Sequence, residues 1–211
     1  MKLLVSLFLL ILLAGCRQPG IPDSFDYGKI ENSIYKNSYF KFEIPVPATW
    51  ALQTREQMDS SLQRGHKIIE ESNRELTPAL KASEINSAIL LSIFRYKPDS
   101  ITDEPNYSMM IVAENVSRNP GIKSGSDYLE SSRKLMKKAN LPYETSNVHH
   151  QKLGNREFDV MTVTIKTQGL EIEQLHCLTV IKGFALGIII SYANSQQEQK
   201  LKNIIQGIRF Q

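Results

Sequence analysis

The sequence predicts an α+β domain with an antiparallel β-sheet of about six to eight strands flanked by helices. After position 142, four strand-like runs are separated by Gly154-Asn155, Gln168-Gly169 and Lys182-Gly183, residues that tolerate positive φ and are typical of a β-meander. Longer amphipathic segments that begin with capping residues predict three helices. Because most strands follow one another in the chain, we expect antiparallel pairing with helices packed on the sheet faces.

The first strands lie in the proline-punctuated segment 30–50. We expect two short strands around a turn at Lys36-Asn37, the second carrying apolar residues on alternate positions. Pro45 and Pro47 cannot donate a ladder hydrogen bond, so the second strand should end there.

A first helix is predicted to begin at Thr54, because Thr54 and Gln57 have the spacing of a capping box. It should extend to about Asn73, although Gly65 weakens its middle. Residues 74–87 are polar and carry Pro78, so we expect a loop there with at most a short turn of helix. The elements that follow are a buried strand at 87–97, a loop at 97–106, a strand at 107–116 and a helix at 124–140.

Four meander strands and a last helix complete the expected order. The strands are predicted at 143–153, 156–168, 170–181 and 184–193. The last helix should start at Ser195 as N-cap with Glu198 three residues on, again a capping box. A short extended segment at 208–210 follows.

The first 29 residues read as an export signal and a tether. Residues 3–13 are apolar except for Ser6, which is the length of a signal-peptide core and too short to span a bilayer. The residues from Leu13 to Cys16 resemble the lipobox of bacterial lipoproteins. The resemblance implies cleavage after residue 15 and a palmitate-type lipid anchor on Cys16. A plain secretory signal with an incidental Cys16, or an uncleaved anchor, are the alternatives.

The expected organisation is therefore a signal peptide at 1–15, a lipidated cysteine with a flexible tether at 16–29, and a single domain at 30–211. By the same resemblance, Arg17 after the cysteine favours the periplasmic face of the outer membrane over the inner membrane. The predicted localisation is the bacterial cell envelope, where the lipid anchor would bind the protein to the membrane.

Composition excludes some partner classes. The formal charge is +3, and removal of Lys2 with the signal leaves +2, with no polybasic block. The composition therefore implies neither nucleic acid nor anionic lipid headgroups as a partner. Of the two cysteines, the lipobox uses one, so Cys177 should be an unpaired and buried thiol.

Four segments together resemble the PsbP-like family, which includes photosystem PsbP and DcrB-type bacterial lipoproteins. They are YFKFEIPVPATW at 39–50, GSDYLESSRKLM at 125–136, GNREFDVMTVTI at 154–165 and the closing strand-helix-strand at 182–210. The resemblance implies an α-β-α sandwich that docks protein partners and has no enzymatic activity. The resemblance implies no catalytic residue and no cofactor for this chain.

The histidines are the candidates for metal chemistry. His149 and His150 are adjacent, so on a strand they face opposite ways and cannot readily share one ion. In a loop they could do so, or one could join His176 across neighbouring strands; exposed turn histidines are the alternative. His176 also precedes Cys177, but neighbours on a strand cannot form a base-nucleophile pair.

Two further groups have functional and structural interpretations. The acids of the loop 99–104 could bind a cation but lack the EF-hand pattern, and a solvated loop is the alternative. Trp50, beside Pro45 and Pro47, either fills the edge of the core or marks a docking patch for a partner.

Two functions remain open from the sequence. The first is a membrane-anchored, non-enzymatic binding or assembly module that engages an unknown envelope protein. The second is a histidine-dependent, metal-binding hydrolase of the envelope that uses His149, His150 and His176.

Overall fold

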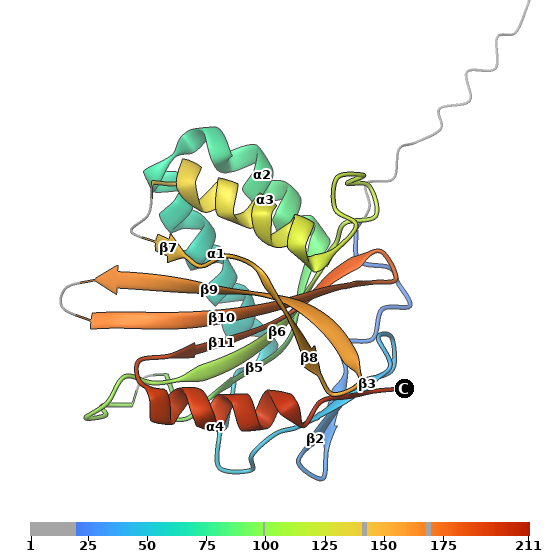
Figure 1. The fold of residues 1–211 in the computed structure, drawn as a ribbon, viewed down its shortest axis with the longest axis vertical. Helices are drawn as coiled ribbons and strands as arrows, with labels where there is room; N and C mark the ends of the chain where they lie inside the picture. Colours follow the sequence, from blue (N-terminus) through green and yellow to red (C-terminus); the bar gives the residue numbers. More distant parts are fainter. Residues whose placement is uncertain (1–19, 99, 141–142, 168–169) are drawn as a thin grey trace, which may run out of the picture.

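The computed structural model describes residues 20–98, 100–140, 143–167 and 170–211 (Figure 1). The predicted signal peptide and Cys16 lie outside the described residues. The strands are β1 Lys29–Glu31, β2 Ile34–Asn37, β3 Phe42–Pro45, β4 Ala51–Leu52, β5 Ser87–Phe94, β6 Ser108–Asn115, β7 Tyr143–Thr145, β8 His149–Leu153, β9 Arg156–Thr167, β10 Leu170–Ile181, β11 Phe184–Tyr192 and β12 Arg209–Phe210. The helices are α1 Arg55–Ser72, a 3₁₀ turn η1 Arg74–Leu76, α2 Thr77–Asn86, α3 Gly125–Lys138 and α4 Ser195–Gln206.

Two antiparallel sheets form the domain. The larger has eight strands in the order β4-β5-β6-β11-β10-β9-β7, and β8 pairs with β9 beside β7. The smaller has four strands in the order β1-β2-β3-β12. These sheets and the flanking helices confirm the predicted α+β class.

Both faces of the large sheet are covered by other elements. Leu178 of β10 packs with Leu129 of α3, whereas its neighbour Cys177 belongs to a cluster that includes Leu201 of α4 and Phe42 of β3. Adjacent strand residues point to opposite faces, so α3 lies on one face and α4 with the small sheet on the other (Figure 1). The larger apolar core lies between the large sheet and the layer formed by α4 and the small sheet.

Local capping chemistry explains where two helices begin. The Thr54 N–H donates to the Gln57 side chain at 2.8 Å, and the Gln57 N–H donates to the Thr54 hydroxyl at 3.3 Å. This confirms the predicted capping box of α1. At α3, Ser124 and Asp127 make the same reciprocal pair of bonds.

The predicted loop at 74–87 is wrong, because α2 occupies most of it. Pro78 lies in the first turn of α2, where the missing proline N–H has no intrahelical partner to lose. The predicted cap of the last helix is wrong by one residue. Asn194 is the N-cap of α4 and its side chain accepts from the Gln197 N–H, while Ser195 is the first helical residue.

Two turns differ from the prediction. β2 continues through Asn37, so the turn expected at Lys36-Asn37 lies at residues 38–41. An earlier turn at Asn32 and Ser33, both with positive φ, joins β1 to β2. The single strand expected at 143–153 is divided into β7 and β8, which pair with different halves of β9.

The segment before β1 packs against the domain, which corrects the extent of the tether predicted at 16–29. The Gly20 carbonyl accepts a hydrogen bond from the Asn115 side chain at 3.0 Å, and Ile21 packs on the core. Phe25 is 8% exposed and lies among the rings of Tyr39, Phe40 and Phe184. In the part of the chain described, no helix has the length and apolar character to cross a membrane.

Candidate docking groove

The structure keeps the three candidate histidines apart. His149 and His150 are exposed on β8, paired in register with Val160 and Asp159 of β9 respectively. The His150 Nδ1 lies 2.7 Å from the Asp159 carboxylate. That carboxylate also accepts the Ser126 N–H at the start of α3, at 2.8 Å.

His176 lies on β10, where its Nε2 is 3.1 Å from the Gln174 side-chain oxygen. Burial removes water from the imidazole and lowers the pKa of His176 to about 4, so the ring is neutral near neutral pH. Among the residues described, no three His, Cys, Asp or Glu side chains gather as a metal site.

Cys177 is the free thiol that the cysteine count predicts. Its side chain is buried in the core, and burial raises the pKa of the thiol to about 12. A thiol in this state is protonated and shielded, so it is a poor nucleophile.

Of the acids in the loop 99–104, Asp99 lies outside the described residues, and a cation site there stays a prediction. Glu104 serves a structural role in the neighbouring contacts. One of its oxygens accepts from the Tyr96 hydroxyl at 3.0 Å, and the other accepts from the Gln197 side chain at 3.2 Å.

Of the predicted docking residues, Pro45 is the last residue of β3, and Pro47 and Trp50 follow it along the chain. Pro45 is exposed, while Pro47 and Trp50 are half-buried. The Trp50 indole packs edge-to-face on Tyr107, with ring centroids 5.3 Å apart. Its contacts are those of a residue that fills the edge of the core; docking at this segment stays a prediction.

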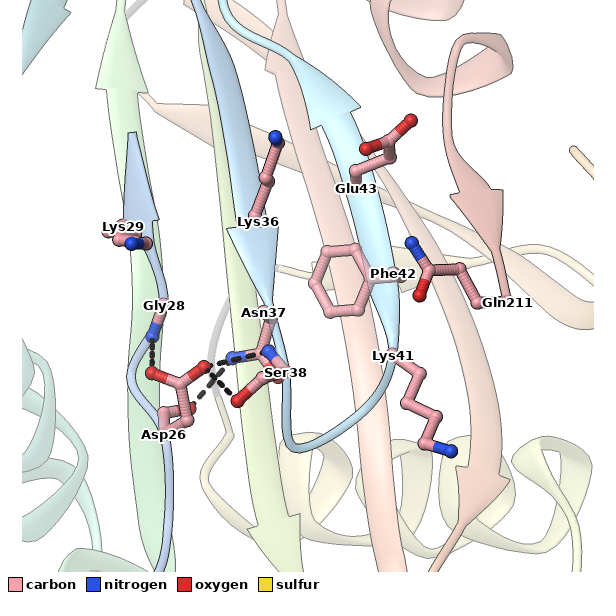
Figure 2. Close-up of a pocket in the computed structure, with 10 residues that line it drawn as sticks. All are labelled: Asp26, Gly28, Lys29, Lys36, Asn37, Ser38, Lys41, Phe42, Glu43 and Gln211. Atoms are coloured by element: carbon pink, nitrogen blue, oxygen red, sulfur yellow. Dashed lines mark hydrogen bonds between the residues drawn. The ribbon is translucent and has the colours of Figure 1, made fainter. Parts of the chain in front are cut away.

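An open groove with a volume of about 800 Å³ lies beside the small sheet (Figure 2). Its lining comes from the segment before β1, from β1 to β3 and from the last residue. The lining residues are Asp26, Gly28, Lys29, Lys36, Asn37, Ser38, Lys41, Phe42, Glu43 and Gln211.

Asp26 and Asn37 fix the shape of the groove at the 38–41 turn. The Asp26 carboxylate accepts hydrogen bonds from the Gly28 N–H, the Ser38 N–H and the Ser38 hydroxyl, each at 2.7 Å. Burial opposes ionisation, but these donors outweigh it and hold the pKa of Asp26 below its ordinary value. The buried Asn37 amide donates to the Asp26 carbonyl and accepts the Phe40 N–H.

Three lysines give the groove its cationic groups. Lys29 is paired with Glu31 at 2.8 Å. Lys36 is the cross-strand neighbour of Glu43, yet within the described ranges no ion pair or hydrogen bond engages the amino group of Lys36 or Lys41. The groove thus presents the amino groups of Lys36 and Lys41, which make no hydrogen bond or ion pair with the residues described, together with the carboxylates of Asp26 and Glu43.

A second concavity, with a volume of about 540 Å³, lies between α2 and α3. Glu114 and Tyr128 line it, and the Tyr128 hydroxyl donates to Glu114 at 2.5 Å. Burial raises the pKa of Glu114, and the bond from Tyr128 only partly offsets this. Burial and the adjacent Glu114 raise the pKa of Tyr128.

Sequence reasoning missed both concavities. The groove combines residues near 26–29, 36–43 and 211, which only the pairing of β1, β2, β3 and β12 brings together. One signal was present: Asp26 precedes Gly28 by two residues, the spacing at which an aspartate accepts a nearby backbone N–H in a turn. It lay in the part of the chain predicted as tether.

Comparison with known proteins identifies the fold. Neither a protein-family model nor a curated protein sequence matches the chain. Among solved structures, cyanobacterial PsbP (CyanoP) from Synechocystis sp. PCC 6803 matches with a TM-score of 0.50 and 8% identity, over 87% of this chain and 96% of that protein.

Two other solved structures are similar. LpqN, involved in cell envelope biogenesis of Mycobacterium tuberculosis, has a TM-score of 0.41 and 13% identity, over 80% of this chain and 82% of LpqN. A Bacteroides thetaiotaomicron protein has a TM-score of 0.46 and 10% identity, over 86% of this chain and 49% of that protein. The DcrB-type part of the resemblance stays a prediction. On the match to cyanobacterial PsbP, the chain has a PsbP-like fold.

Proposed function

We propose that the chain is a lipid-anchored protein of the bacterial envelope that docks a protein partner in the groove beside its small sheet. The export signal and the residues around Cys16 support the anchor. The observation that carries the docking function is the pair of free amino groups, Lys36 and Lys41, at an open groove of about 800 Å³. The partner segment is polar and supplies an acid to these lysines.

The shape of the groove favours a protein segment over a small molecule. Small-molecule sites bury most of their ligand and are lined mainly by apolar side chains. This groove is open, and most of its lining side chains are charged or polar (Figure 2). Charged groups at such a surface mainly set orientation and association rate.

We propose that the function is not enzymatic. The alternative hydrolase needs two or more imidazoles on one ion. His149 and His150 alternate on β8, and His176 is bonded to Gln174 on β10. No contact in the described part of the chain favours that alternative over docking.

The test is site-specific photocrosslinking in the cell. A photoreactive residue at position 29, an exposed position that lines the groove, should capture a discrete partner. Reversal of charge at Lys36→Glu with Lys41→Glu should abolish the capture. The matched control, Lys81→Glu with Lys97→Glu, reverses two exposed lysines elsewhere and should leave it intact.

Two further results decide the proposal. The crosslink should weaken as salt rises, because exposed charges are screened within about 10 Å at 0.1 M. Capture that is equal in both double variants would refute docking at the groove.

For the anchor, Cys16→Ala should lose labelling by a palmitate analogue and leave the membrane fraction; retention in that fraction would refute lipidation.

A further inference from the structure

The docked segment before β1 leaves little chain between the proposed anchor and the domain. Gly20 lies four residues after Cys16, and its carbonyl is already bonded to Asn115 at the end of β6. Ile21 and Phe25 then pack into the core. A tether running from residue 16 to residue 29 would reach about 45 Å at full extension, whereas the four steps to Gly20 reach about 14 Å.

From this length we infer that the domain rests on the lipid surface in one orientation, with the Gly20 end facing the bilayer. The inference depends on the proposed lipidation of Cys16. A cysteine that carries acyl chains lies in the headgroup layer, which is about 5–7 Å thick on each side of the bilayer. Gly20 then lies within about 14 Å of that layer, whatever path the intervening residues take.

The surface around Gly20 is formed by the loop 116–124 and the β10–β11 turn. The Val116 N–H donates to the Gly183 carbonyl at 2.9 Å, which joins the two segments. We call this surface, residues 116–124 with Lys182 and Gly183, the anchor end. The loop 116–124 and the β10–β11 turn lie together beside the start of the described chain in Figure 1.

The charges of the anchor end suit phospholipid headgroups. Arg118, Lys123 and Lys182 are exposed there. The acids nearby are Asp23, which is exposed, and two acids of α3. Glu130 lines a hollow with the loop 116–124 and pairs with Arg133. The Asp127 carboxylate accepts the Lys123 N–H, the Ser124 N–H and the Ser124 hydroxyl. At a membrane surface, exposed basic side chains such as these are attracted to lipid phosphates. Lys182 also donates to the Tyr39 carbonyl at 2.6 Å.

The opposite end of the domain should face away from the membrane. β6 runs from Ser108 to Asn115, so its ends are separated by about 23 Å. The loop 95–107 precedes β6 and the loop 116–124 follows it. These two loops therefore provide matched near and far positions for one measurement.

The experiment uses the full chain, processed by a bacterium and reconstituted into vesicles of phosphatidylethanolamine and phosphatidylglycerol. Pro120→Cys and Ser100→Cys place one exposed thiol in each loop. Lipidation occupies Cys16 and burial shields Cys177, so a fluorophore labels only the new cysteine. A nitroxide on the lipid headgroup should quench most of the fluorescence at position 120 and little at position 100.

A linker insertion tests whether chain length sets the orientation. About 20 Gly/Ser residues between Pro19 and Gly20 raise the root-mean-square span to roughly 27 Å. In vesicles of neutral lipid, this insertion should reduce the difference between the two labels. Equal quenching at both positions with the original spacing, or a difference unchanged by the linker, would overturn the inference.

The same sample separates this inference from the proposed anchor. Mass spectrometry of the purified chain reports whether Cys16 carries acyl chains. A chain without lipid would refute both the anchor and the orientation, whereas a lipidated chain with equal quenching would refute the orientation alone.

Discussion

Replacement of Phe25 by alanine tests whether residues 20–28 belong to the domain. Phe25 is 8% exposed, and its ring centroid lies 4.8 Å from Tyr39, 5.7 Å from Phe40 and 5.5 Å from Phe184. Truncation of a buried phenylalanine costs about 3–5 kcal/mol. Because Phe25 lies near the edge of the core and the segment can detach alone, we expect a loss of about 3 kcal/mol in the free energy of unfolding.

The assay is urea unfolding followed by the fluorescence of Trp50, the single tryptophan of the chain. Limited proteolysis by chymotrypsin in parallel reports detachment of the segment, since Tyr27 becomes a substrate when released. Tyr27→Ala is the matched control. That ring is 39% exposed. It stacks on the Arg55 guanidinium and packs edge-to-face on Phe25, with centroids 5.2 Å apart, contacts worth about 0.5–1.5 kcal/mol each.

The two variants must differ if the packing of Phe25 holds the segment. Equal losses of unfolding free energy in Phe25→Ala and Tyr27→Ala would contradict the assigned role of Phe25. So would a Phe25→Ala protein that keeps both the original urea midpoint and the original resistance to chymotrypsin.

Three other predictions concern single side chains elsewhere in the fold. Gly125→Ala should lose about 1–3 kcal/mol of stability because the new Cβ overlaps a carbonyl oxygen of β10. Gly65→Ala, with open space around it in α1, should gain up to about 1 kcal/mol; a higher urea midpoint for Gly125→Ala would contradict the first prediction, and a lower one for Gly65→Ala the second. Tyr128→Phe removes the donor to Glu114 and should cost about 1–3 kcal/mol at pH 8. Because burial raises the folded-state pKa of Glu114, the folded state favours the protonated acid, and that contribution is complete below the unfolded pKa and lost as pH rises through the folded value. The cost should therefore be smaller at pH 4, and equal costs at pH 4 and pH 8 in urea unfolding would refute this. Cys177, with its thiol pKa raised to about 12 by burial, should react with Ellman's reagent at pH 8 only after unfolding; rapid reaction of the folded chain would show that the thiol is accessible.

Local chemistry predicted elements where one interpretation was available. The Thr54 and Gln57 pair has no competing cap nearby, and α1 begins where that pair indicates. At α4, Asn194 and Ser195 are both good N-caps, each with a suitable residue three positions on. The sequence alone does not decide between them, because the choice depends on the direction in which the chain leaves β11. In the structure, Asn194 is the N-cap.

The missed helix has a different cause. Pro78 was interpreted as a breaker, but in the first turn of a helix proline costs nothing, and α2 begins one residue before it. The boundary of the tether failed for a related reason. The residues around Phe25 are polar or typical of turns, so the sequence predicted a flexible segment. In the structure the Phe25 ring packs against Tyr39, Phe40 and Phe184.

The groove was beyond local reasoning. Its two free lysines, Lys36 and Lys41, are ordinary surface residues in the sequence. Their common position depends on the hairpin register of β2 and β3 and on the Asp26 contacts that shape the turn between them. The PsbP-like resemblance predicted the layered arrangement of helices and sheet, but it did not predict where a binding groove would lie.

If Cys16 carries the proposed lipid anchor, its short connection to Gly20 has a consequence for affinity. A domain held within about 14 Å of a bilayer diffuses only in a thin layer next to the membrane. A partner anchored in the same membrane is confined to that layer too. Tethering over such short spans gives effective concentrations in the millimolar range. A groove that binds too weakly to retain a partner in dilute solution would then be largely occupied at the membrane, and release of the anchor would dissociate the pair without any change in the groove.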